Sequence, residues 1–191
     1  AQHTLNRVLK ILKTLVSQLD ILETMTPAEF LSFRKFLESA SGFQSAQFRE
    51  LEFMLGHKLP KMLDYHEQGS SARICLEQRL AAPSLRDAFL FCLSQNKIKI
   101  PQTLLERNVT QADAASSEVQ TQLIEVFRSS PVLAQLCELL VDLDEGLQEW
   151  RYRHVKMVER TIGTKRGTGD SMGAEYLKKT LFQPIFPALW A

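Results

Sequence analysis

Apolar residues recur at intervals of three and four along most of the chain, the spacing that gathers them on one face of an α-helix. The first segment shows this pattern most clearly. Eight apolar residues there fall on one stripe that we expect to be buried: Leu5, Val8, Leu9, Leu12, Leu15, Val16, Leu19 and Leu22. No segment sustains the period-two alternation that is typical of a strand. The pattern therefore predicts an all-α fold, a helical bundle around long helices.

Start and stop signals divide the rest of the pattern into further helices. The sequence TPAE at 26–29 combines a capping threonine, a proline at the first helical position and a glutamate that completes a capping box, so a helix is expected over about 27–38. A third helix is expected over 45–56, where Gly56 supplies the stop. Shorter helices are expected near 72–80, 84–94 and 119–127, with a loop around Pro101.

The longest expected helix begins at Pro131 and continues through Gly146 to Ile162, about 45 Å at 1.5 Å per residue. Its apolar stripe consists of Leu136, Leu140, Leu143, Leu147, Trp150, His154, Met157 and Val158. Its last turns carry basic residues that suit the negative end of a helix and can be a solvated terminus: Arg151, Arg153, Lys156 and Arg160. Gly163 ends the helix and opens a glycine-rich loop near the C-terminus. We expect one all-α domain over 1–191.

His154 stands on that stripe where another apolar residue is expected. Such a histidine can be a core side chain hydrogen-bonded to a backbone carbonyl, or it can be a ligand, because neutral imidazole is the commonest protein ligand for transition metals and haem iron. The other histidines, His3, His57 and His66, are not spaced to share a helix face with it. A multi-histidine metal site is therefore disfavoured, whereas a single axial bond to haem stays open.

The loop GTKRGTGDSMG at 163–173 fits neither the dinucleotide-binding fingerprint nor the phosphate-binding P-loop. Its glycines allow backbone N–H groups to approach an anion closely. Lys165 and Arg166 add positive charge, and Thr168 and Ser171 add hydroxyl groups. The loop is therefore either a site for an anionic ligand or a flexible surface linker.

Phe30 and Arg34 are four residues apart on the second helix and share a face that Leu37 continues. Ser41 and Gly42 follow at the end of that helix. An arginine beside an aromatic ring can bind a carboxylate through two parallel hydrogen bonds. The alternative is an arginine whose stem packs on the core while its head reaches water.

The composition of the chain indicates which kinds of partner and which compartment to expect. Apolar residues make up 45% and charged residues 24%, as in an ordinary globular protein. The formal net charge of +1 provides no global field for nucleic acid or a membrane surface, so neither is expected as a partner. Three cysteines without CxxC spacing disfavour zinc and disulfide frameworks and favour a reducing compartment. No signal peptide or membrane-spanning run is found, so a cytoplasmic location is expected.

Four stretches together resemble the haem-dependent tryptophan 2,3-dioxygenases: LETMTPAEFLSFRKFLESASGFQSAQFRELEFMLGHK at 22–58, APSLRDAFLFCL at 82–93, WRYRHVKMVERTIGTKRGTGDSMG at 150–173 and FPALW at 186–190. The resemblance covers essentially the whole chain. It implies an enzyme that opens the indole ring of L-tryptophan across C2–C3 with O2, giving N-formylkynurenine in the first step of the kynurenine pathway. It also implies haem b as cofactor and a homotetramer.

The resemblance assigns roles to individual residues. His154 matches the proximal ligand of the haem iron, and Arg34 matches the residue that holds the substrate carboxylate. Phe30 matches an aromatic position of the substrate pocket, and Thr168 matches a threonine that contacts the substrate ammonium and carboxylate. The remaining expected pocket-lining residues are Leu37, Ser41 and Gly42.

Two departures from the family leave alternatives open. The loop usually reads Gly-Thr-Gly-Gly-Ser, and here Asp170 takes the place of the third glycine. The family's distal histidine lies in a helical segment with a motif like His-Gln-x-x-Glu-Leu-Trp, which nothing in the 191 residues matches. No acid–base catalytic residue is therefore identified, and we expect preceding residues or a second chain to complete the pocket. The alternatives are a relative acting on a modified indole, or a non-catalytic haem- or indole-binding protein.

Overall fold

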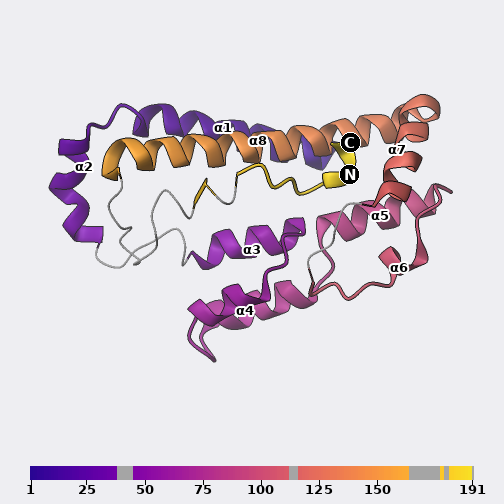
Figure 1. Cartoon of the computed structure of the whole chain (residues 1–191), viewed down its shortest axis with the longest axis horizontal. Coiled ribbons are helices and arrows are strands. Elements are labelled where there is room, and N and C mark those ends of the chain that lie inside the picture. Colours follow the sequence, from indigo (N-terminus) through magenta and orange to yellow (C-terminus); the bar gives the residue numbers. More distant parts are fainter. Residues whose placement is uncertain (38–44, 112–115, 164–176, 179–180, 191) are drawn as a thin grey trace. The chain divides into compact units, whose positions relative to one another are not determined.

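The computed structural model of the chain describes residues 1–37, 45–111, 116–163, 177–178 and 181–190. Most of these residues are helical, and no β-strand occurs among them, which confirms the all-α prediction. The α-helices in Figure 1 are α1 (Gln2–Leu22), α2 (Pro27–Arg34), α3 (Ala46–Leu55), α4 (Ser71–Ala81), α5 (Leu85–Gln95), α6 (Gln102–Leu105), α7 (Ser117–Ser129) and α8 (Pro131–Ile162). Short 3-10 helices cover Lys35–Leu37, Pro60–Tyr65 and Pro187–Leu189.

Two compact units divide the chain. Unit 1 consists of Ala1–Phe43 and Glu138–Pro184, and unit 2 consists of Gln44–Cys137 and Ile185–Ala191. The first turns of α8 therefore belong to unit 2 and the rest of that helix belongs to unit 1. The expectation of one haem-binding domain over 1–191 stays a prediction.

In unit 1, α1 and α8 pack side by side and run in the same direction (Figure 1). A Cβ added to Gly146 of α8 would lie 2.7 Å from Cδ2 of Leu12 in α1. Further along both helices, Arg153 hydrogen-bonds Glu23, the residue after α1. The contacts advance together along the two helices, as a parallel pair requires. This close approach explains why a glycine stands inside the longest helix, where it otherwise lowers stability.

The predicted stripe of α1 is only partly buried. Four of its eight members are buried: Leu5, Leu12, Val16 and Leu19. Three others are exposed: Val8, Leu15 and Leu22. The prediction of one fully buried stripe is therefore wrong in part, because the face of α1 that packs against α8 covers a narrower arc than eight positions spaced three and four apart.

Helix α8 has the bounds that the sequence predicts, and Gly163 follows it with a positive φ of 60°. The middle of its predicted stripe is buried, at Leu140, Leu143 and Leu147. The other members are half-buried: Leu136, Trp150, His154, Met157 and Val158. The last part of the stripe therefore borders the surface of the described structure and is not a closed core.

The capping box at the start of α2 forms as predicted. The Glu29 N–H donates to Thr26 Oγ1 at 3.3 Å, and the Thr26 N–H donates to Glu29 Oε2 at 2.8 Å. These hydrogen bonds hold the pKa of Glu29 below its usual value. Helix α2 ends at Arg34 and continues as the 3-10 turn Lys35–Leu37, so its α-helical part is shorter than the predicted 27–38.

Unit 2 contains the helices that the sequence predicts as α3, α4, α5 and α7, each bounded within three residues of its expected range. Serine side chains cap the first turn of all four: Ser45, Ser70, Ser84 and Ser116. Helix α6 and the 3-10 helices at Pro60–Tyr65 and Pro187–Leu189 were not predicted. These segments are too short to show a helical apolar period.

Lys58 in unit 2 is only 1% exposed. Its Nζ donates to the backbone oxygens of Arg79, Leu80 and Ala82 at 2.6, 3.0 and 2.7 Å. Carbonyl groups at a helix end have no partner within the helix, so the buried ammonium group caps the end of α4. Burial lowers the pKa of Lys58.

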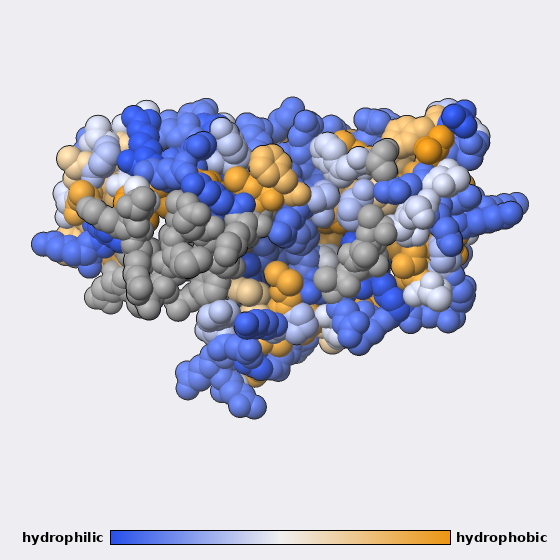
Figure 2. Space-filling model, viewed as in Figure 1, coloured by the Kyte–Doolittle hydropathy of each residue, from blue (hydrophilic) through white to orange (hydrophobic). Residues whose placement is uncertain are grey.

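Polar and charged side chains predominate on the face drawn in Figure 2, where apolar side chains form separate patches. Among the residues that the structure describes, no helix is both long enough and apolar enough to cross a membrane.

Candidate functional site

The site is built around His154 on the half-buried face of α8. Trp150, one turn earlier, stacks on its imidazole, with 5.6 Å between the ring centroids and 25° between the planes. Burial lowers the pKa of His154. The ring is therefore neutral near pH 7, and a neutral imidazole carries the nitrogen lone pair that binds a metal.

No group in the described part of the chain hydrogen-bonds the His154 ring. A fully buried histidine would need such a partner, because a buried polar group without one is costly, but the half-buried ring of His154 can also bond water. The described residues also contain no group of three or more His, Cys, Asp or Glu side chains that could hold a metal ion together. A single neutral imidazole without a protein partner fits a group that takes one axial ligand, such as haem iron.

Two arginines of α8 hydrogen-bond Glu23, the first residue of the corner between α1 and α2. Arg153 donates from Nε to Glu23 Oε1 at 2.9 Å and from Nη2 to Glu23 Oε2 at 2.7 Å. Arg160 donates from Nη1 to the backbone oxygen of Glu23 at 2.7 Å. The Arg153 guanidinium holds the pKa of Glu23 below its usual value. The side chain of Arg153 is 20% exposed and Arg151 is buried, so the expectation of a solvated basic terminus is wrong at these two residues.

Phe30 and Arg34 lie on consecutive turns of α2, and Leu37 lies in the 3-10 turn that continues it. All three side chains are half-buried. The ring of Phe30 packs edge-to-face on Phe33, with 5.3 Å between centroids and 76° between planes. A half-buried arginine beside half-buried apolar side chains is the arrangement expected of a wall that binds a charged head group next to an apolar ring.

The structure places Phe30, Arg34, Leu37 and His154 in the same compact unit. The predicted site residues Ser41, Gly42 and Thr168 lie outside the described residues, as do the charged loop residues Lys165, Arg166 and Asp170. Their roles stay predictions.

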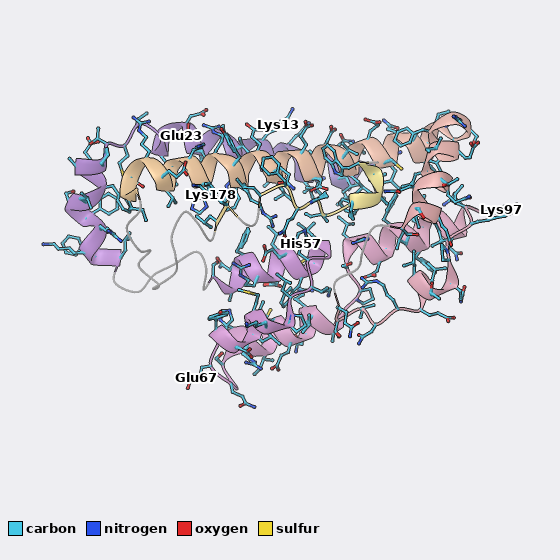
Figure 3. The ribbon with its side chains drawn as sticks, in the orientation of Figure 1. Lys13, Glu23, His57, Glu67, Lys97 and Lys178 are labelled. Carbon is cyan, nitrogen blue, oxygen red and sulfur yellow. The ribbon has the colours of Figure 1, made fainter. Side chains whose placement is uncertain are left out.

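After the glycine-rich loop, the described residues Lys178 and Phe182 contact α8 in the order expected of a segment that runs in the opposite direction. Lys178 Nζ lies 2.8 Å from Glu159 Oε1, and the Phe182 N–H donates to Gln148 Oε1 at 3.1 Å. Figure 3 shows Lys178 and Glu23 beside this helix. Lys156 also pairs with Glu159, at 2.9 Å. Lys178 and Lys156 together lower the pKa of Glu159 to about 2.

The sequence pattern indicates no role for Glu23 and predicts Arg153 and Arg160 only as charges at a helix end. The sequence contains only part of the information that would predict these contacts. The basic residues of α8 are spaced so that 153 and 160 share a helix face, but nothing local indicates an acidic partner 130 residues away.

Comparison with known proteins agrees with these observations. The family model of tryptophan 2,3-dioxygenase matches residues 2–80 and 105–191. The tryptophan 2,3-dioxygenase of Herpetosiphon aurantiacus is 56% identical over the whole chain, which covers 73% of that protein. The enzymes so named from Anaeromyxobacter sp. strain K and Arthrobacter sp. strain FB24 are 53% and 43% identical over the whole chain, which covers 72% and 68% of them. The matched ranges contain α2 and α8.

Proposed function

Because the chain belongs to the tryptophan 2,3-dioxygenase family, we propose that it opens the indole ring of L-tryptophan with O2 to give N-formylkynurenine. The observation that carries this proposal is the 56% identity over the full length of the chain to a protein of that name. This reaction is the first step of the kynurenine pathway, and it makes the protein an oxidoreductase.

His154 would hold the cofactor, haem b, as its axial ligand. Three features support this assignment: burial lowers the pKa of the imidazole, the ring is half-buried, and it has no hydrogen-bond partner among the described residues. Bound haem would supply an iron with one coordination position left for dioxygen. Trp150 restrains the plane of the imidazole by stacking on it.

The substrate would be held by its two ends. The guanidinium of Arg34 can donate two parallel hydrogen bonds to the carboxylate, and the resemblance adds the hydroxyl of Thr168 for the ammonium and carboxylate. The half-buried ring of Phe30 offers an apolar surface to the indole. Fixing the head group at Arg34 orients the indole before reaction, which removes much of the entropic cost of bringing the reactants together.

The remaining features of the proposal follow from the family and the cysteines. We expect a homotetramer, with L-tryptophan and O2 as substrates. We also expect a reducing compartment such as the cytoplasm, because the three cysteines lack the spacing of a disulfide or zinc framework.

Asp170 supports a second candidate, a relative that acts on a modified indole, because a carboxylate in the glycine-rich loop disfavours a second carboxylate nearby.

One experiment tests both candidate functions. The protein, produced from its complete natural reading frame, is reconstituted with haem and its absorption spectrum is recorded with and without L-tryptophan. The reduced protein is then supplied with O2 and L-tryptophan, and N-formylkynurenine is measured.

We expect a stoichiometric haem spectrum, a shift of that spectrum on addition of L-tryptophan, and product. Haem binding without a response to tryptophan would favour the modified-indole candidate, and a response without product would favour a non-catalytic binding protein. No haem binding would contradict the proposal.

A further inference from the structure

We infer that Glu23 is a positioning residue: held by Arg153 and Arg160, it fixes the helix that carries Phe30 and Arg34 relative to the helix that carries His154. The inference rests on the proposed function, since it gives α2 the substrate and α8 the haem. Glu23 itself touches neither group in this account. It acts through the placement of the two helices.

Arg153 and Arg160 hydrogen-bond both the side chain and the backbone of Glu23. Both carboxylate oxygens accept hydrogen bonds from Arg153, at 2.9 and 2.7 Å, and the backbone oxygen accepts one from Arg160 at 2.7 Å. The side chains of Arg153 and Glu23 are 20% and 33% exposed, so water weakens this pair less than a fully exposed one. Two-bonded arginine–carboxylate pairs are also geometrically specific. Glu23 is therefore held at three atoms by one face of α8.

Each residue of the corner between Glu23 and α2, at 24–26, makes a hydrogen bond. The N–H groups of Thr24 and Met25 donate to Ile21 and Leu22 oxygens at 3.2 and 3.1 Å. The Thr24 hydroxyl donates to the Ile21 oxygen at 2.7 Å, and Thr26 is engaged in the capping box with Glu29. No residue between Glu23 and the first turn of α2 lacks a hydrogen bond. A displacement of Glu23 is therefore passed on to Phe30 and Arg34.

The two arginines that bond Glu23 lie in the same helix as the candidate haem ligand, His154. Arg153 is the residue before His154 in α8, and Arg160 lies about two turns further along. Successive helix positions point about 100° apart, so Arg153 can hold Glu23 while His154 presents its ring to another side. Arg153 also donates to Asp20 at 2.5 Å and to the backbone oxygen of Val16 at 3.3 Å, which anchors it on α1.

The test compares Glu23→Gln with two matched variants. Glu23→Gln keeps the shape of the side chain and removes its charge. Asp20→Asn removes the other carboxylate that pairs with Arg153, but Asp20 lies in the last turn of α1, before the corner, and its side chain is 67% exposed, so this pair contributes little. Glu50→Gln removes an ion pair with Arg79 in unit 2, where the two atoms are 2.8 Å apart.

We expect Glu23→Gln to raise KM for L-tryptophan by about five- to twentyfold while kcat stays within about twofold, because the head-group site is displaced and the haem ligand is not. The Kd of the ferric protein for L-tryptophan, read from the Soret band, should rise by the same factor at unchanged haem content. Asp20→Asn and Glu50→Gln should leave KM and Kd unchanged. A variant that only unfolds more readily lowers the amount of active enzyme at constant KM.

A double-mutant cycle tests whether Glu23 acts through Arg153. If Glu23 acts through Arg153, then Arg153→Gln with Glu23→Gln should raise Kd no further than the larger single change. Wild-type KM and Kd in Glu23→Gln, an equal rise in Asp20→Asn, or additive effects in the double variant would overturn the inference while the proposed function stands. A wild-type protein that binds no haem or forms no product would instead overturn the proposed function, and the inference with it.

Discussion

The indole of Trp150 stacks on the imidazole of His154 one turn further along α8, with 5.6 Å between their centroids. Residues four apart on a helix share a face, so this contact is built into the helix and does not depend on a distant segment. The stack covers one side of the imidazole and limits its rotation. No group in the described structure hydrogen-bonds the ring nitrogens, which is consistent with the proposed bond from His154 to haem iron.

His154→Ala should therefore abolish stoichiometric haem binding while the protein stays helical. The substitution removes the proposed axial ligand and leaves a residue that favours helices. Haem content is measured from the Soret absorbance of the purified protein, and helicity from circular dichroism. The control is His3→Ala, which removes an exposed histidine from α1. A wild-type ferrous haem spectrum in His154→Ala would show that the ligand lies elsewhere.

Arg34→Ala should lower kcat/KM for L-tryptophan by roughly 30- to 1000-fold, the equivalent of about 2–4 kcal/mol for a charge-assisted two-bonded contact. Arg34→Lys should be nearly as damaging, because a point charge does not replace a planar fork. The comparison is made by steady-state kinetics, with Arg128→Lys as control on the exposed surface of α7. Values within about twofold of wild type in either Arg34 variant would remove Arg34 from the site.

Local signals predict most of the helices but not the contacts that assemble the site. Thr26 and Ser84 cap helices through the residue three positions later, and that relation can be read from the sequence. Arg153 and Glu23 are 130 residues apart, and no local pattern joins them. The burial of Lys58 is likewise unpredictable, since a lysine is almost never fully buried without partners that the fold alone supplies.

Lys58→Met should lower the free energy of unfolding by about 2–4 kcal/mol. The substitution keeps an unbranched side chain of similar length but leaves three carbonyl groups at the end of α4, one of them buried and two part-buried, without their donor. Urea denaturation measures the change. Lys61→Met, at an exposed position three residues away, is the matched control and should change the stability by less than about 0.5 kcal/mol. Equal stabilities of the two variants would mean that the ammonium group does not cap α4.

Gly146→Ala should destabilise the protein although alanine is the better helix former. The added Cβ would lie 2.7 Å from Leu12 Cδ2 and 3.3 Å from its Cγ, so α1 and α8 must separate or Leu12 must move. Overpacking costs about 1–3 kcal/mol, against about 1 kcal/mol gained from helix propensity. Leu12→Val shortens the facing side chain and should recover part of the loss in the double variant. A higher melting temperature for Gly146→Ala would contradict the close contact.

Glu159 predicts a pH dependence of stability in the acid range. Its pKa is lowered from 4.5 to about 2, first by Lys178 and then by Lys156. A carboxylate whose pKa is lower in the folded than in the unfolded state contributes stability that is fully present above its unfolded pKa. That contribution is lost as the pH falls from about 4.5 towards 2, since the unfolded chain then binds the proton more readily than the folded one.

Glu159→Gln removes this titrating group, so the variant should have a lower melting temperature than wild type above about pH 5.5, and the difference should shrink as the pH falls to 3. Lys178→Met should reduce the same pH dependence more than Lys156→Met does, because Lys178 has the largest effect on the Glu159 pKa. The side chains of Glu159 and Lys178 are partly exposed, at 28% and 44%, so added salt should also reduce the difference. Thermal unfolding between pH 3 and 7 measures these changes. A difference that stays constant over that range would show that Glu159 does not hold Lys178 against α8.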